Sequence, residues 1–379
     1  MTWAVPARQT GDRRRSRGGN HPPAAPGRET SPVYNVGLFV PLSSAAAVWG
    51  PSCVACAELA VDEINRAGGL NGREINLITA DAGARPEDVA DLADQLLDCN
   101  AIDAVVGMHI SNVRAALAPR IAGRIPYVYT PLYEGGEFHP RVYAIGETPE
   151  DQLKPALTWM AMQRGARRWA LVGNDYVWPR TSHALARRFI ADFGGDVAGE
   201  VYLPLGTEDF EPCLERLAEM GADAVLVSLV GQDAIAFNRA FGERDMHRRL
   251  LRLSMAMDEN TLLGIGAQNT INLFAASGYF TSLENDANHA FIERYRSRFG
   301  MRAPVPGAHG QSIYEGFAFL NAALRTQQGR PVRIPGVRGS VYLDNSRKGI
   351  PIYLAEADGV SFRVLPESLT LPLHAAGAH

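Results

Sequence analysis

Short apolar runs alternate with amphipathic segments through most of the chain, and this alternation restricts the possible folds more than any other feature of the sequence. The run VYNVGLFV at 33–40 predicts a strand. After it, Val54, Ala57, Val61 and Ile64 recur at spacings of three and four, which is typical of one face of a helix. Short apolar strands separated by helices occur in parallel sheets that are covered on both faces. The alternation therefore predicts an α/β fold.

Two such series follow each other, so two lobes are expected. The first series continues with strands at 74–80 and 125–130, and the second begins near Pro149. Strands of the second series are predicted at 167–173, 199–204, 224–229 and 250–256. A chain of 379 residues is also longer than one ordinary domain. We therefore expect two doubly wound α/β lobes.

The pattern changes after the second series. A strand is predicted at 272–280, and helices are predicted at 285–299 and 311–325. The last apolar segments alternate like a hairpin, with a tight turn at Asp358 and Gly359.

The first 32 residues differ in composition from the rest of the chain. They are rich in Arg, Gly and Pro and lack apolar periodicity, so a disordered tail is expected at 1–32. An export signal would need an apolar run of roughly 7–15 residues after the arginines at 13–15, and none follows. The chain as written is therefore expected to be cytoplasmic, whereas a misassigned start codon would place it in the periplasm or at the cell surface.

Several classes of protein are disfavoured. A net charge of −4 gives no indication of nucleic-acid binding. The hydrolase and phosphate-binding motifs GxSxG, HExxH and GxxxxGK[ST] are absent, so we expect no enzyme and no cofactor. Cys53 and Cys56 form a CxxC pair inside a predicted helix, where small buried thiols are a simpler interpretation than a metal site.

Polar and aromatic residues cluster after the predicted strands. Open α/β sheets bind ligands beyond the carboxyl ends of their strands. These residues are Ser43, Ser44, Trp49, His109, Ser111, Tyr129, Thr130, Tyr133, Glu134, Asp258, Glu259 and the segment DYVWPR at 175–180. Serine hydroxyls and helix N-termini can bind a polar group, and Tyr and Trp can form apolar walls with one polar edge. A ligand-binding cleft is therefore expected.

Some of these residues have simpler explanations. Ser111 could cap a helix, Glu259 could be an acid of a first helical turn, and Trp49 could belong to the core. Arg180 could form a surface ion pair. Tyr176 and Trp178 are two apart, and the next helix is expected at 183–193, so an extended turn would point both side chains the same way.

Four segments carry a resemblance to a known family. They are AVDEINRAGGLNGR at 60–73, YTPLYEGGEFHP at 129–140, NDYVWPRTS at 174–182 and EVYLPLGTEDF at 200–210. From residue 33 to about 365 the chain resembles the type I periplasmic binding proteins of the Leu/Ile/Val-binding class, and within them the urea and short-chain amide branch. The resemblance implies two lobes that are joined by three crossovers, with a ligand cleft between them. Lobe one would comprise 33–147 and 279–335, lobe two 148–278 and 336–365, and 366–379 would be a flexible tail.

The resemblance also implies a site and a function. The implied ligand-binding residues are His109, Ser111, Tyr129, Tyr176 and Trp178, with Glu259 and Ser43 as further candidates. Relatives usually have an aromatic residue at His109, where a histidine could titrate near neutral pH, and Tyr or Phe at Trp178. The ligand would be a small polar solute such as urea, a short-chain amide or an amino-acid-like compound.

Two roles are compatible with this resemblance. The first is the substrate-binding component of an ABC-type transport system, with a permease as partner. The alternative is a cytoplasmic amide sensor that holds a regulatory protein and represses amidase expression. An association of identical chains is left open in both.

Overall fold

The computed structural model describes residues 33–325, 332–333, 336–338, 341–343, 346–348 and 350–366. The tails expected at 1–32 and 366–379 lie outside these residues, apart from Pro366. Within the described part, no helix combines the length and the apolar character that crossing a membrane requires.

Five parallel strands form the first sheet, in the order β2-β1-β3-β4-β5. Their bounds are β1 Val33–Val40, β2 Glu74–Asp81, β3 Ala104–Gly107, β4 Tyr127–Tyr129 and β5 Val142–Ala144. Successive side chains of a strand point to opposite faces. Thus Leu38 of β1 packs in the same cluster as residues of α1 and α10, whereas Phe39 packs in the cluster of α2 and α3.

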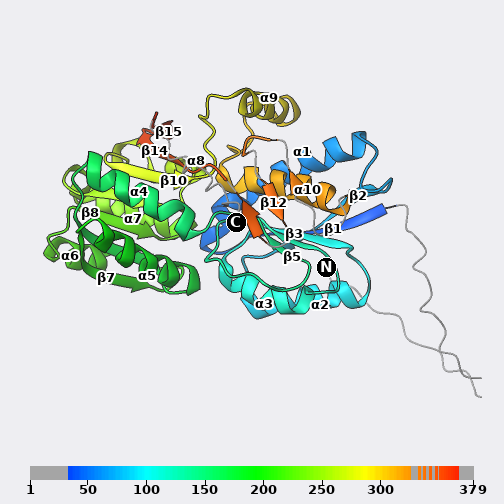
Figure 1. The fold of residues 1–379 in the computed structure, drawn as a ribbon, viewed down its shortest axis with the longest axis horizontal. Coiled ribbons are helices and arrows are strands. Elements are labelled where there is room, and N and C mark those ends of the chain that lie inside the picture. Colours follow the sequence, from blue (N-terminus) through cyan, green and yellow to red (C-terminus); the bar gives the residue numbers. More distant parts are fainter. Residues whose placement is uncertain are drawn as a thin grey trace, which may run out of the picture. The chain divides into compact units, whose positions relative to one another are not determined.

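Helices cover both faces of this sheet (Figure 1). They are α1 Gly50–Arg66, α2 Pro86–Asp98, α3 Ser111–Ile121 and α10 Ala308–Arg325, whereas α9 Asp286–Phe299 packs against α1. The short 3-10 helix η1 (Ala45–Trp49) leads from β1 into α1. Although α10 is distant in sequence, it packs against α1.

Seven strands form the second sheet, in the order β15-β14-β10-β9-β8-β6-β7. Their bounds are β6 Arg168–Asn174, β7 Asp196–Leu203, β8 Ala224–Ser228, β9 Leu251–Ser254, β10 Leu273–Ser277, β14 Tyr353–Asp358 and β15 Ser361–Val364. The pairs from β6 to β10 are parallel, and β14 and β15 form the expected antiparallel hairpin. Gly359 has φ 64° in its turn, a conformation that glycine adopts readily.

The second sheet is also covered on both faces (Figure 1). The helices are α4 Pro149–Gln163, α5 Val177–Asp192, α6 Glu211–Glu219, α7 Gly231–Glu243 and α8 Glu259–Ile265. Smaller elements are the 3-10 helices η2 Met246–Arg248 and η3 Ala267–Asn269 and the strands β11 Val332–Arg333, β12 Val341–Leu343 and β13 Ser346–Lys348. The predicted α/β class with two sheets is confirmed. The lobe boundaries remain a proposal.

A buried polar cluster joins the three connections between the sheets. Glu147 lies between β5 and α4, Gly278 follows β10, and Arg338 lies between α10 and β14. The Glu147 carboxylate accepts hydrogen bonds from the Gly278 N–H at 3.0 Å and from Arg338 Nη1 at 2.7 Å. Arg338 also lies 3.3 Å from the buried Glu315 carboxylate of α10. One guanidinium therefore ties together segments that are nearly 200 residues apart in the chain.

Candidate functional site

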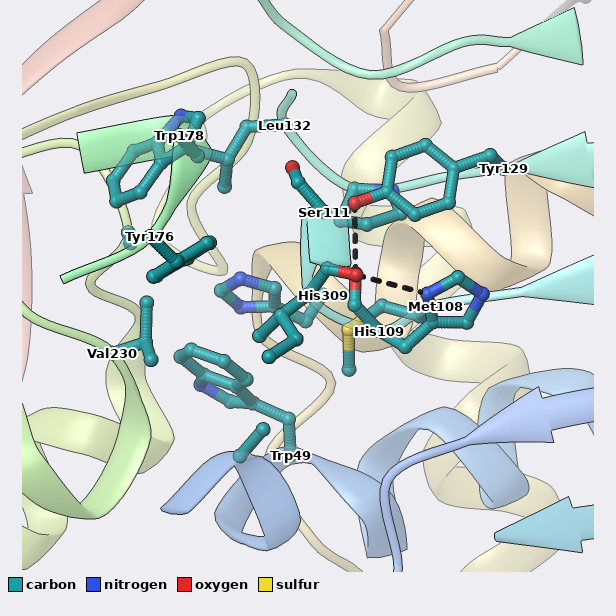
Figure 2. A pocket seen from close by; sticks show the side chains of 14 residues that line it. Trp49, Met108, His109, Ser111, Tyr129, Leu132, Tyr176, Trp178, Val230 and His309 are labelled. Carbon is teal, nitrogen blue, oxygen red and sulfur yellow. Dashed lines mark hydrogen bonds between the residues drawn. The ribbon is translucent and has the colours of Figure 1, made fainter. Parts of the chain in front are cut away.

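A cavity with about 350 Å³ of empty volume lies where side chains from both sheets meet. Its lining includes Trp49, Met108, His109, Ser111, Tyr129 and Leu132 from the first series of elements, Tyr176, Trp178, Val230 and Ala256 from the second, and His309 of α10. In Figure 2, the residues of the second series lie on the left, and His109, Ser111 and Tyr129 lie opposite them. The five principal residues predicted from the sequence are thus brought together.

Three helices begin at the wall of this cavity. Ser111 is the first residue of α3, Tyr176 is the N-cap of α5, and Val230 is the N-cap of α7. The first N–H groups of a helix have no carbonyl partner within the helix, and the helix dipole gives that end partial positive charge. Neither Tyr176 nor Val230 makes a side-chain capping bond. The cavity is therefore suited to accept an electron-rich oxygen group.

His109 is a structural wall of the cavity and carries no charge near neutral pH. Its Nδ1 lies 3.2 Å from the Ile110 carbonyl oxygen, which can only accept, so the proton resides on Nδ1. Its Nε2 then accepts from the Tyr127 hydroxyl at 2.9 Å. Burial lowers the pKa of His109 to about 3, against which the bond to the Ile110 carbonyl acts only weakly. The expectation that His109 titrates near neutral pH is wrong for this reason.

Tyr129 is held from two sides. Its hydroxyl donates to the His109 carbonyl oxygen at 2.8 Å, as Figure 2 shows. Behind the ring, the Arg114 guanidinium lies 5.5 Å from the ring centre and forms ion pairs with Glu134 and Glu137. Glu134 therefore supports the wall from behind rather than lining it, and the same arginine contacts the ring of Tyr133.

Tyr176 and Trp178 line the cavity from the start of a helix and not from the extended turn that was predicted. The helix begins at Val177 rather than at His183, because Pro179 is tolerated in a first helical turn and Tyr176 has the extended backbone of an N-cap. The two rings lie 6.4 Å apart and both line the cavity. Trp178 Nε1 is buried and has no hydrogen-bond partner in the described part of the chain.

Trp49 and Asp258, both named from the sequence, form a unit with His309, which sequence reasoning missed. Asp258 is the fully buried N-cap of α8, and its Oδ1 accepts from Trp49 Nε1 at 3.2 Å. His309 Nδ1 lies 3.3 Å from Asp258 Oδ2, and the His309 ring stacks on Trp49 with centroids 3.9 Å apart. Burial alone would raise the pKa of Asp258, but the hydrogen bond and the charge of His309 outweigh it and hold this pKa below its usual value. His309 follows a loop rather than a strand, so no strand-end signal could have found it.

Two further candidates predicted from the sequence do not line the cavity. Ser43 is exposed, and its backbone N–H donates to Asp81 at 3.2 Å, which fixes the loop after β1. Glu259 is buried and accepts from the N–H and the hydroxyl of Thr281, each at 2.7 Å. Burial raises the pKa of Glu259 to about 7. Both residues make local hydrogen bonds and lie outside the cavity lining.

Arg180, Cys53 and Cys56 follow the simpler interpretations of the sequence. Arg180 forms an exposed ion pair with Asp175. Cys53 and Cys56 are free, buried thiols of α1, and burial raises the pKa of both. No group of three or more His, Cys, Asp or Glu residues in the described ranges is placed to hold a metal ion. His183 is fully buried between Tyr202 and Ser228.

Comparison with known proteins gives a consistent result. Residues 33–337 match the model of a family described as periplasmic binding protein. A curated relative is the Leu/Ile/Val-binding protein homolog 6 of Brucella melitensis, which is 22% identical over 285 residues, covering 72% of this chain and 71% of the relative.

Solved structures share the fold. An ABC transporter substrate-binding protein from Sphaerobacter thermophilus superposes with a TM-score of 0.73 at 22% identity, covering 88% of this chain and 97% of that one. A solute-binding protein from Rhodopseudomonas palustris in complex with p-hydroxybenzoic acid gives a TM-score of 0.75 at 20% identity, with 88% and 96% covered. A branched-chain amino acid transporter substrate-binding protein from Streptococcus pneumoniae in complex with isoleucine gives 0.73 at 18%, with 88% and 99% covered.

The expected compartment has to be corrected. The sequence as written predicted a cytoplasmic protein because no apolar run follows the first arginines. The matching family is one of periplasmic binding proteins, so this expectation is wrong. The comparisons likewise give no support to the alternative of a cytoplasmic amide sensor with a regulatory partner.

Proposed function

Because the chain belongs to the periplasmic binding protein family, we propose that it is the substrate-binding component of an ABC-type transport system, with a permease as its partner. The cavity would hold one small polar solute. One observation carries this proposal. Aromatic side chains and the N-termini of three helices, contributed by elements of both halves, surround one small cavity.

The size and lining of the cavity support a small ligand. Only about 30 Å³ is open to the centre of a water molecule, far below the roughly 300–1,000 Å³ of most ligand pockets, so without opening the cavity suits only a very small ligand. Urea, short-chain amides and amino-acid-like compounds are the candidates that the resemblance suggests. Aromatic rings at Trp49, Tyr129, Tyr176 and Trp178 provide apolar contact with few polar groups.

The proposed mechanism is closure. The solute docks first on Ser111, Tyr129 and the N-terminus of α3. The half built on the second sheet then approaches and adds Tyr176 and Trp178. Binding shifts an equilibrium between open and closed states that exists without ligand, and the permease recognises the closed state.

A thermal-shift screen tests this proposal. A ligand that binds only the native state raises the melting temperature by mass action. The purified protein would be screened against urea, short-chain amides, small carboxylates and branched-chain amino acids. At least one of these classes should raise the melting temperature.

The double variant Ser111→Ala/Tyr176→Ala should lose this shift. Ser111→Ala removes a polar contact and Tyr176→Ala removes an aromatic wall, each of about 1–1.5 kcal/mol, so affinity should fall roughly 100-fold. The double variant Ser43→Ala/Glu259→Gln is the matched control, since both side chains lie outside the cavity lining. If Ser111→Ala/Tyr176→Ala keeps the parental shift while remaining folded, the site assignment is wrong.

A further inference from the structure

We infer that the cavity selects a small organic acid over the matching amide or α-amino acid, and that His309 sets this preference. The inference rests on the proposed solute-binding function and names the chemical class of the solute. It concerns one polar atom, His309 Nε2, at the cavity wall.

The charges at the cavity wall disfavour an amino acid. No Asp, Glu, Lys or Arg is among the described residues that line the cavity. A ligand ammonium group would therefore be buried without a carboxylate partner, which is costly. Glu134 and Glu137 do not fill this role, because both are paired with Arg114 behind the wall.

Asp258 orients the His309 ring. Asp258 is fully buried, and its Oδ2 accepts the Nδ1 proton of His309 at 3.3 Å. His309 is the one basic side chain in the described part of the chain within ion-pair distance of Asp258. A ligand carboxylate at Nε2 would place the ring between two carboxylates, and this arrangement favours the imidazolium, whose Nε2–H donates to the ligand.

The position of the His309 ring leaves Nε2 available to a ligand. His309 is only 4% exposed, and its ring is stacked on Trp49 at an interplanar angle of 19°. An aromatic face also stabilises a cationic ring that lies against it. The structure gives Nε2 no hydrogen-bond partner among the described residues, while Nδ1 is occupied by Asp258.

The helix N-termini reinforce the same preference. The helices α3, α5 and α7 have 11, 16 and 13 residues, and all three begin at the cavity wall. Their free N–H groups and His309 Nε2–H are all donors, and a carboxylate offers only acceptors. The NH₂ group of an amide would instead meet further donors.

Calorimetric titration with sets of matched compounds tests this inference. Isobutyrate, isobutyramide and valine form one set, and benzoate, benzamide and phenylglycine form a second. In at least one set the parent protein should bind the acid about tenfold or more tightly than the amide and the amino acid. In His309→Gln the ratio of acid to amide affinity should fall roughly tenfold or more, because a charge-assisted hydrogen bond is replaced by a neutral one.

Two further variants make the result unambiguous. His289→Gln is the matched control, because His289 lies on α9 with a side chain that is 59% exposed, and it should keep the parental ratio. If His309→Gln does not fold, Asp258→Asn/His309→Gln removes the buried charge together with its partner and should show the same fall in the ratio.

The possible results separate the inference from the proposed function. Tighter binding of an amide or an amino acid than of the acid would overturn the inference and leave the solute-binding function intact. An acid preference that is unchanged in His309→Gln would overturn the role of His309. No binding of any compound would contradict both the inference and the function on which it rests.

Discussion

At the scale of single residues, burial decides the charge of His183. His183 lies between the Tyr202 hydroxyl and the Ser228 hydroxyl, each 3.1 Å from a ring nitrogen. Burial lowers the pKa of His183 to about 4, and the opposing charge of Glu200 does not compensate for it. The unfolded chain binds this proton more readily, since its pKa is about 6.5. His183 therefore costs no stability above pH 6.5 and destabilises the fold progressively as the pH falls towards 4.

His183→Gln should reduce the loss of stability in acid. Between about pH 6.5 and 4, each pH unit should cost the parent about 1.4 kcal/mol more than the variant. The raised pKa of Glu259 acts in the opposite direction, but it is common to both proteins and cancels in the difference. Denaturant unfolding at several pH values measures this, with the exposed His289→Gln as control. Parallel pH profiles for the parent and His183→Gln would contradict the assignment.

The sequence identified some site residues and missed others for a physical reason. His109, Ser111, Tyr129, Tyr176 and Trp178 follow strands, and parallel strands bring their carboxyl ends to one edge of a sheet. A position after a strand does not determine where a residue's side chain points. Hydrogen bonds with Asp81 and Thr281 keep Ser43 and Glu259 out of the cavity lining. His309 has no such signal, because its place depends on the packing of α10 against α1.

At the scale of elements, α7 and η1 meet closely at a glycine. Gly231 is the first residue of α7 and has φ +52°. A Cβ at this position would lie 2.0 Å from the Ala45 carbonyl oxygen of η1. Because η1 follows β1 of the first sheet and α7 follows β8 of the second, this approach requires the two halves to be together.

Gly231→Ala should weaken ligand binding without unfolding either half. The added methyl group lowers the population of the closed state, and apparent affinity falls with that population, by about tenfold or more. Gly221→Ala is the matched control, since Gly221 has φ +62° and a Cβ there meets nothing within 4 Å. Calorimetric titration of both variants compares the effects. Equal affinities for the two variants would show that the contact between α7 and η1 does not accompany binding.

The elements themselves were largely predictable. The alternation of strands and helices was correct because each strand is buried between helices and each helix has one apolar face. The sequence predicts a helix from His183, six residues later than the observed start of α5 at Val177, and Pro179 lies in the first turn of that helix. Local patterns predict the type of an element better than its first residue.

At the scale of the whole molecule, Arg338 joins the connections between the sheets. The carboxylates of Glu147 and Glu315 face its guanidinium, and all three residues are buried. This cluster could not be predicted from the sequence, because its members come from segments far apart in the chain. The proposed lobe boundaries lie close to Glu147, Gly278 and Arg338, so the cluster is situated where a closing motion would bend the chain.

Arg338→Met should destabilise the whole protein. Removing one partner of a buried ion pair leaves the opposite charges uncompensated and costs about 3–5 kcal/mol. Arg363→Met is the control, because Arg363 is 58% exposed in its ion pair with Glu356, and such surface pairs contribute about 0–1 kcal/mol. Denaturant unfolding gives both values. A loss below about 1 kcal/mol for Arg338→Met would contradict the structural role of the cluster.

The central claim is that one small solute binds in the cavity between the two sheets. A crystal structure of the protein with the tightest compound from the calorimetric sets tests it most directly. We expect density for that compound among Trp49, Ser111, Tyr176 and Trp178, with its carboxylate at His309 Nε2 and the helix N-termini. Density for the compound at any other place, with this cavity empty, would contradict the claim.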